Sequence, residues 1–342
     1  MPNKRVTMQD IATACGLSRN TVSKAFNGRG SVPQATKKMI IKKAEELGYG
    51  SPVESGAPNS KQTGGSIALL TSKMPKDAHF GITFISTFSD QISRSGYSLK
   101  IYEISQEELK EKRLPPHFDQ ERIAGIVGVE LFSQDYLHMI CGLGIPTVMT
   151  DSPMEAISSL MECDYVTMEN VAGILVLVQR LASSGAKKIG FVGDNYHCGS
   201  FGERWAGFTL GLKTFGLQLD EDLCICQPDN SPYNDPDWLI SIIQKMPTLP
   251  DAFVCANDYL AIHLMSALKK MGLSIPKDIM VTGFDGTSQS ALVEPPLTTV
   301  AIPGVEIGRI AAGTLLNRIV NPDFPFTWTR VKTTPVWRGS IR

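Results

Sequence analysis

Five polar residues close together near the N-terminus have side chains that can contact nucleic acid: Arg19, Asn20, Thr21, Ser23 and Lys24. An arginine can donate two hydrogen bonds to the major-groove acceptors of guanine, and an asparagine can pair with the edge of adenine. Threonine and serine hydroxyls suit phosphate oxygens. The alternative interpretation of this stretch is a small helical bundle with ordinary surface charges.

A second set of polar residues directly follows apolar runs in the remainder of the chain: Asp151, Asp194, Asn257, Asp258 and Asp285. Ligands of open α/β sheets bind outside the carboxyl ends of the strands, so this position selects candidate ligand contacts. Arg204 lies at the start of the helix expected after Asp194. An arginine that donates and carboxylates that accept can bracket vicinal hydroxyls. Asp194 and Asp258 are interpreted instead as caps of the helices that follow them.

The first set is placed by short helices. Thr7 stands three residues before Asp10, which resembles a capping box, and Gly16 suits a left-handed turn after the first helix. Ser18 can cap a second helix, and Pro33 can begin a third. Two short helices joined by a tight glycine turn form the helix-turn-helix motif.

Charge separates this region from the rest. Residues 1–61 hold ten Lys and Arg against four acids, a net of +6, and the remaining chain holds 23 against 30, a net of −7. A basic region on an acidic body indicates that only the basic region meets a polyanion.

From residue 66 onward, apolar runs alternate with amphipathic stretches, which predicts parallel sheets with helices on both faces. The expected strands are 67–72, 98–104, 123–129, 145–151, 187–194, 222–227, 251–258 and 278–286. The predicted fold class is α/β: an N-terminal all-α helix-turn-helix domain followed by two doubly wound parallel-sheet subdomains.

The predicted domains are a DNA-binding headpiece at 1–50, a linker at 51–65 and an effector-binding and dimerisation domain at 66–342. The linker is rich in Gly, Pro and Ser. Within the last domain, one subdomain takes about 66–163 plus 293–323, and the other takes about 164–290 plus 324–342.

The segment from Val6 to Tyr49 resembles the headpiece of the LacI/GalR family of bacterial transcription regulators, through VTMQDIA, GLSRNTVSKAFN and ELGY. The resemblance implies that Arg19, Asn20 and Lys24 read bases. It also implies contacts with phosphates at five positions: Thr7, Ser18, Thr21, Ser23 and Asn27. The hinge helix usual in the family is opposed here, because Gly56 and Pro58 both disfavour a helix interior.

The body is similar to the same family and to the type I periplasmic sugar-binding fold, through AND (256–258), GFD (283–285) and PPLTTV (295–300). The resemblance implies effector contacts at five residues: Arg204, Asn257, Asp285, Asp151 and Phe80. Gly286 stands where the family often has a second Asp, and His263 stands where a small residue is common.

Other classes of function lack their motifs. We find no G-x-G-x-x-G opening the first βα unit, no phosphate-binding G-x-x-x-x-G-K-[ST] and no G-x-S-x-G, so an enzyme is not expected. The seven cysteines are scattered, and Cys224 with Cys226 is interpreted as one face of a strand, so neither disulfides nor a metal is expected. No cofactor is expected. No spanning helix and no signal segment is seen, so a cytoplasmic location is expected.

These observations predict a dimeric DNA-binding regulator, most simply a repressor, that is controlled by a small polar effector. A sugar or sugar derivative suits the polar set at the strand ends, and a purine or nucleoside is the alternative effector. A sugar-binding transport or chemoreceptor component is the competing function. Such a component would carry a signal peptide and no basic headpiece, the reverse of this chain.

Overall fold

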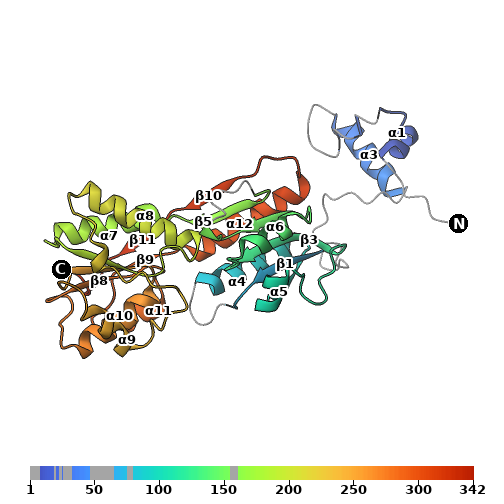
Figure 1. Ribbon diagram of the computed structural model, residues 1–342. Helices are drawn as coiled ribbons and strands as arrows, with labels where there is room; N and C mark the ends of the chain where they lie inside the picture. Colours follow the sequence, from blue (N-terminus) through green and yellow to red (C-terminus); the bar gives the residue numbers. More distant parts are fainter. Residues whose placement is uncertain are drawn as a thin grey trace. The chain divides into compact units, whose positions relative to one another are not determined.

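The computed structural model describes residues 8–18, 21–22, 25, 33–46, 65–74, 80–154 and 161–342. The chain divides into two compact units, Met1–Lys61 and Gln62–Arg342 (Figure 1). In the described ranges, no helix has the length and apolar character needed to cross a membrane.

The first unit contains α1 (Met8–Cys15) and α3 (Gln34–Glu46), and Thr21, Val22 and Ala25 are also helical. Their shared core consists of Ile11, Ala12, Val22, Ala25, Ile40 and Ala44. Gly16 adopts a φ of +66°, as expected of the turn that ends α1. The predicted cap of the second helix is confirmed, since the Ser18 hydroxyl accepts the Thr21 N–H at 3.1 Å. Thr7, predicted to form a capping box with Asp10, lies outside the described residues.

The second unit begins with a six-stranded sheet in the order β10-β5-β4-β3-β1-β2, in which all neighbours are parallel. Its strands are β1 (Ser66–Thr71), β2 (Ser98–Glu103), β3 (Ile123–Val129), β4 (Thr147–Met149), β5 (Asp164–Met168) and β10 (Trp328–Val331). The chain leaves β1 toward β2 on one side and then returns to β3 on the other, which is the doubly wound order.

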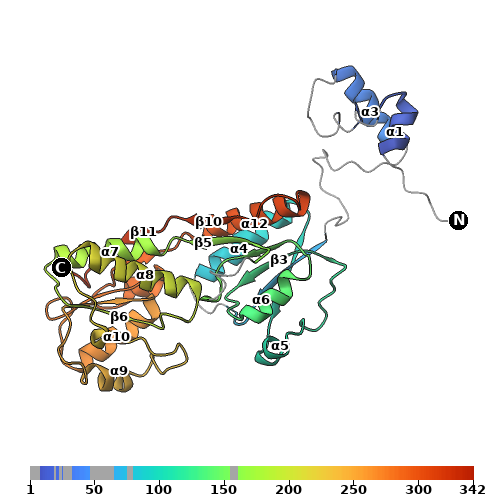
Figure 2. The same cartoon turned by 45° about the horizontal axis from the view of Figure 1, so that its top comes forward.

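Helices cover both faces of this sheet. They are α4 (Phe80–Arg94), α5 (Gln106–Glu111), α6 (Gln134–Cys141) and α12 (Gly304–Val320). Alternate residues of β1 point to opposite faces: Leu69 joins the core that includes Phe88 of α4, whereas Leu70 joins the core that includes Leu137 of α6. α4 and α12 lie side by side on their face (Figure 2).

A second parallel sheet, β6-β7-β8, is formed by β6 (Ile189–Val192), β7 (Ala252–Cys255) and β8 (Met280–Thr282). Its helices are α7 (Val171–Ser183), α8 (Gly199–Thr214), α9 (Pro236–Ile243), α10 (Asp258–Lys270) and α11 (Ser288–Leu292), with a short 3₁₀ helix at Glu221–Leu223. β9 (Thr299–Ala301) pairs antiparallel with β11 (Thr334–Val336). α7 and α8 can approach closely because residue 207 is a glycine. A Cβ at this position would lie only 2.7 Å from the Val171 carbonyl oxygen.

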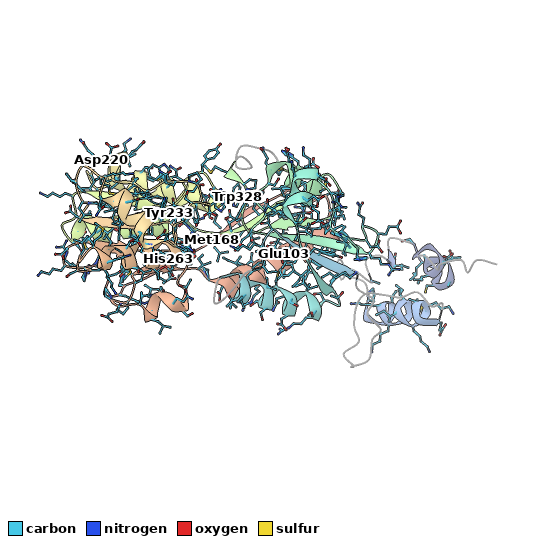
Figure 3. All side chains as sticks on the ribbon, turned by 60° about the horizontal axis from the view of Figure 1, so that its bottom comes forward. Glu103, Met168, Asp220, Tyr233, His263 and Trp328 are labelled. Carbon is cyan, nitrogen blue, oxygen red and sulfur yellow. The ribbon has the colours of Figure 1, made fainter. Side chains whose placement is uncertain are left out.

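The predicted α/β fold class is confirmed, but three strands differ from the predicted subdomain boundaries. β5 and β10 fall in the residues expected to form the second subdomain, whereas both pair into the first sheet. β9 falls in the residues expected to join the first subdomain, whereas it runs beside the second sheet, where Ala301 bridges Asp285. An apolar run does not specify which sheet edge it joins. Three connections then cross between the two sheet regions: β5 to α7, β9 to α12 and β10 to β11. Met168 at the end of β5 and Trp328 at the start of β10 mark this region (Figure 3).

The predicted strand at 222–227 is also wrong. Only Ile225 makes a bridge, to Val192, because the 3₁₀ helix occupies the start of this run.

Candidate functional site

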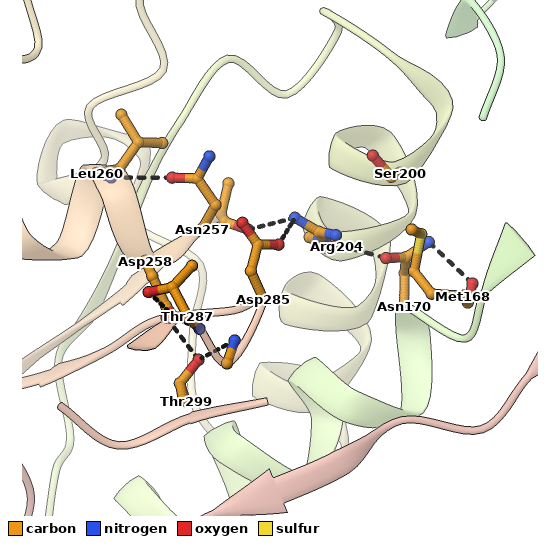
Figure 4. A network of polar contacts seen from close by, with 12 residues as sticks. Met168, Asn170, Ser200, Arg204, Asn257, Asp258, Leu260, Asp285, Thr287 and Thr299 are labelled. Atoms are coloured by element: carbon orange, nitrogen blue, oxygen red, sulfur yellow. Dashed lines mark hydrogen bonds and ion pairs between the residues drawn. The ribbon is translucent and has the colours of Figure 1, made fainter. Parts of the chain in front are cut away.

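Polar side chains from the carboxyl ends of several strands meet beside the N-terminal half of α8. Asn170 follows β5, Asn257 follows β7 and Asp285 follows β8, and Arg204 on α8 lies among them (Figure 4). The structure therefore brings together three of the five predicted effector contacts: Arg204, Asn257 and Asp285. The last two were selected by the rule that ligands bind at the carboxyl ends of strands, called the strand-end rule below.

Arg204 is a buried cation with a fixed position. Its side chain is 3% exposed, its Nε donates to Asn170 Oδ1 at 3.0 Å, and its Nη1 donates to the Ala256 carbonyl at 2.7 Å. The guanidinium carbon lies 3.9 Å from the ring centroid of Phe284, which adds a cation–π contact. These contacts hold the guanidinium in one orientation.

Asp285 is held in an unusual backbone conformation next to Arg204. Its φ is +112°, and its N–H donates to the Val300 carbonyl at 2.9 Å. Its Oδ1 lies 3.5 Å from Arg204 Nη1, a long contact for an ion pair. Burial raises the pKa of Asp285 to about 7, and the nearby Asp258 and Glu130 add to the increase while Arg204 opposes it. A strained, buried acid with a raised pKa is typical of functional sites.

Asn257 caps α10, because its Oδ1 accepts the Leu260 N–H at 2.9 Å. The cap was expected at Asp258, one residue later, and that prediction is wrong. Asp258 is buried and accepts hydrogen bonds from Thr287 N, at 2.7 Å, and from the Thr299 hydroxyl, at 2.5 Å. Within the described part of the chain, Asn257 Nδ2 makes no hydrogen bond, so it is free to donate to a ligand.

Asp194 was also expected to cap the following helix, but the N-cap position of α8 is Cys198, whose side chain makes no capping hydrogen bond. The two carboxylate oxygens of Asp194 instead accept the backbone N–H groups of Tyr196 and Asp229, each at 2.9 Å. Asp194 therefore stabilises the loop before α8.

Asp151 joins the end of β4 to the N-terminus of α8. Its Oδ2 accepts the Ser200 hydroxyl at 2.6 Å, and its Oδ1 accepts the N–H groups of Ser200 and Ser152 at 3.1 and 2.8 Å. Burial raises the pKa of Asp151, while these hydrogen bonds and Arg204 lower it. Both oxygens already have partners, so Asp151 joins the two sheet regions directly. The side chain of Phe80, the remaining predicted effector contact, lies outside the described residues.

Glu203 and Arg330 belong to the same hydrogen-bond network, and the charge of Glu130 acts on Asp285; all three were missed from the sequence. Glu203 accepts Asn170 Nδ2 at 2.8 Å and Arg330 Nη2 at 2.5 Å, which connects β10 to the Arg204 site. Glu130 directly follows β3, so the strand-end rule that selected Asp151 would also have selected it. The involvement of Arg330 depends on the pairing of β10, which no local pattern reveals.

Two of the predicted phosphate contacts can be placed. The hydroxyls of Ser18 and Thr21 lie 2.8 Å apart at the start of the second helical segment. The other predicted DNA contacts lie outside the described residues: Thr7, Arg19, Asn20, Ser23, Lys24 and Asn27. In the described ranges, no group of three or more His, Cys, Asp or Glu side chains is arranged to hold a metal ion.

Two family models match this sequence. The family described as "Bacterial regulatory proteins, lacI family" matches residues 7–51, and "Periplasmic binding protein-like domain" matches residues 178–341. The chain is 26% identical over 337 residues to the ribose operon repressor of Bacillus subtilis (strain 168), covering 98% of both. It is also 26% identical over 344 residues to the HTH-type transcriptional repressor PurR of Haemophilus influenzae (strain ATCC 51907 / DSM 11121 / KW20 / Rd), again covering 98% of both.

Solved structures show the same fold. A transcriptional regulator CelR–cellobiose complex has a TM-score of 0.72 and 24% identity, with 98% of this chain and 100% of that chain covered. A lac repressor dimer bound to operator and an anti-inducer has a TM-score of 0.68 and 20% identity, with 98% and 99% covered.

Proposed function

Because this chain belongs to the LacI family of bacterial regulatory proteins, we propose that it is a transcriptional repressor whose operator affinity is set by a small polar effector bound beside Arg204, Asn257 and Asp285. The family consists of DNA-binding transcriptional regulators and not of enzymes. The competing transport function is disfavoured, because the repressors cited above align with 98% of this chain, headpiece included.

In this proposal, residues 1–50 are the headpiece, 51–65 the linker and 66–342 the effector-binding and dimerisation domain. Arg19, Asn20 and Lys24 read bases, and Ser18 and Thr21 are among the residues that contact phosphates. Two copies bind a near-palindromic operator, since one headpiece of this size contacts few bases. The protein acts in the cytoplasm, where chromosomal DNA is accessible.

The observation that carries the effector site is the arrangement of Arg204, Asn257 and Asp285 at the strand ends. A buried arginine fixed by neutral acceptors, a free amide donor and a weakly paired carboxylate suit a ligand that offers both hydroxyl donors and oxygen acceptors. This favours a sugar, the class of effector shown by the CelR–cellobiose complex. A purine or nucleoside is the second candidate, favoured by the similarity to PurR.

A thermal-shift screen of sugars, sugar derivatives and nucleosides tests this proposal on the wild type and on Asp285→Ala. We expect the best wild-type ligand to bind the variant about 1–3 kcal/mol less tightly, because the ligand hydroxyl that Asp285 would accept is left without a partner. Asp90→Ala is the matched control, since Asp90 is exposed and pairs with Arg94 on the same helix. Equal stabilisation of the wild type and Asp285→Ala would place the site elsewhere.

A further inference from the structure

The side-chain amide of Asn170 lies between Arg204 and two other acceptors. Its Oδ1 accepts the Nε–H of Arg204 at 3.0 Å, and its Nδ2 donates to the Met168 carbonyl at 3.2 Å (Figure 4). The same Nδ2 also donates to Glu203 Oε2 at 2.8 Å. Half a turn of the amide would direct its NH₂ group at the Arg204 donor and its oxygen at two other oxygens. The amide can therefore satisfy all three neighbours in one orientation only.

Glu203 is the acceptor that contributes most to this orientation. Its bond to Asn170 is shorter than the bond from Asn170 to the Met168 carbonyl, and a hydrogen bond to an ionised group is roughly twice as strong as one between neutral groups. The Glu203 side chain is only 12% exposed, so water replaces the bond poorly. Burial raises the pKa of Glu203, while the Asn170 hydrogen bond and the charge of Arg330 lower it.

Arg330 occupies the other oxygen of the same carboxylate. Its Nη2 donates to Glu203 Oε1 at 2.5 Å, and its guanidinium carbon lies 5.4 Å from the ring centroid of Trp328. Arg330 lies on β10 of the first sheet, whereas Glu203 lies on α8, which packs on α7 beside the second sheet. Both carboxylate oxygens are thus accepting, one from each partner, and the carboxylate is held from outside the effector site.

These hydrogen bonds lead to the proposed effector contact Arg204. Its Nε is directed at Asn170 and its Nη1 at the Ala256 carbonyl, at 2.7 Å. The side chain is 3% exposed, so loss of the Asn170 acceptor would leave a buried donor unpaired, and the guanidinium would have to turn. Its position, with Nη1 3.5 Å from Asp285 Oδ1, therefore depends on Asn170, and the orientation of Asn170 depends on Glu203.

We propose that Glu203 is a positioning residue of the effector site: through Asn170, it sets the orientation in which Arg204 meets the effector. Arg330 holds the Glu203 carboxylate in place. This role rests on the proposed function, because it concerns the effector site beside Arg204. A carboxylate is required at residue 203, since an amide cannot accept from Asn170 and Arg330 at the same time.

Glu203→Gln should disturb the site through competition for a single acceptor. The glutamine has one acceptor oxygen, and Arg330, a charged donor, forms the stronger bond to it. The glutamine NH₂ group then faces Asn170 Nδ2, which favours the turned amide and removes the acceptor from Arg204 Nε. Adding Arg330→Met removes the competing donor, so the glutamine oxygen can accept from Asn170 again and the original orientation should return.

The measurement follows solvent exchange of the Arg204 Nε–H by NMR, in the full chain with isotopically labelled arginine and without ligand. The signal is assigned by its absence from Arg204→Lys. Exchange should be about tenfold faster in Glu203→Gln, because the buried donor has lost its acceptor. It should be about threefold faster at most in Arg330→Met, and the double variant should return to that value. Glu306→Gln with Arg309→Met removes the same charges at exposed positions of α12 and is the control.

This exchange measurement needs no ligand, so it decides the positioning role by itself. Exchange that is unchanged in Glu203→Gln, or that stays as fast in the double variant as in Glu203→Gln, overturns the inference and leaves the proposed function standing.

Calorimetry with D-ribose, cellobiose and adenosine as probes relates the orientation of Arg204 to binding. A probe that binds the wild type should bind Glu203→Gln about tenfold more weakly and should regain its affinity in the double variant. Faster exchange without any loss of affinity for that probe would show that Glu203 orients Arg204 but that Arg204 does not meet the effector. That result would overturn the proposed effector site.

Discussion

At Asp285, the pKa reflects a competition in which burial prevails over a neighbouring cation. The carboxylate is 13% exposed and has Arg204 at 3.5 Å, yet its pKa is raised to about 7. The hydrogen bonds of Arg204 go largely to Asn170 and Ala256, so the arginine compensates the aspartate only in part. The burial of Asp285 therefore lowers the stability of the fold, which is the trade-off expected at the proposed effector site.

This competition predicts that Asp285→Asn stabilises the ligand-free protein at neutral and higher pH. An acid whose folded pKa is raised contributes no penalty below its ordinary value of 3.8, and the penalty grows as pH rises toward about 7. The gain should be small near pH 4 and reach ~2–4 kcal/mol near pH 8. Denaturant unfolding of both proteins across this range measures it, and a gain that does not change with pH would contradict the raised pKa.

Base recognition by the headpiece is also predicted to depend on single residues. Arg19→Ala and Asn20→Ala should each cost about 1–3 kcal/mol of specific binding and relax the preference at one operator position. A phosphate contact behaves differently, because its loss weakens all sequences about equally. Binding selections on randomised DNA distinguish the two roles. An unchanged base preference in both variants would show that Arg19 and Asn20 do not read bases.

Much of the candidate site could be proposed at this scale, because ligands of open α/β sheets bind at the carboxyl ends of strands. The rule selected Asp151, Asn257 and Asp285, and Glu130 satisfies it equally. It could not separate Asn257 from Asp258, because the choice of cap depends on backbone angles at one residue. Glu203 joins the site only through its bonds to Asn170 and Arg330, which come from other elements of the chain.

Among the elements, α12, β5 and β10 are joined by a buried ion pair. Arg318 near the end of α12 donates to the two carboxylate oxygens of Asp164 at 2.9 and 3.1 Å. The backbone N–H of Thr327, just before β10, donates to the same carboxylate at 2.8 Å. Trp328 then stacks on Tyr165 of β5, with ring centroids 4.7 Å apart. The hydrogen bonds to Asp164 and the ring stack help to place β10 on the first sheet. Hydrophobic periodicity did not predict this placement.

Arg318→Met should therefore destabilise the second unit by about 3–5 kcal/mol, since it leaves the Asp164 charge buried without its partner. Arg309→Met is the matched control, because Arg309 is exposed on the same helix. Adding Asp164→Asn to Arg318→Met should recover part of the loss, because the uncompensated charge is removed. Unfolding monitored in denaturant gives the three values. A loss below about 1 kcal/mol in Arg318→Met would show that the pair does not anchor these elements.

For the whole molecule, the charge division of the sequence matches the two compact units of the fold. The net +6 covers residues 1–61, and the first unit is Met1–Lys61. The net −7 of the remaining chain repels DNA, so attraction to phosphates comes from the headpiece alone. The sequence could predict this division, because charge is additive along the chain. It cannot predict the pairing of two copies, because that pairing depends on surface complementarity.

The last prediction concerns that pairing on DNA. A dimer that places two headpieces on a symmetric operator neutralises about twice as many phosphates as one headpiece does, and each phosphate contributes about −0.9 to the slope of log affinity against log salt. Replacing one half-site by unrelated sequence should lower the affinity to near the non-specific level, and light scattering should show a dimer at micromolar concentration. Fluorescence anisotropy on both duplexes over a salt series measures affinity and slope together. If a single half-site binds with the same affinity as the full operator, the protein reads DNA with one headpiece and the dimer proposal fails.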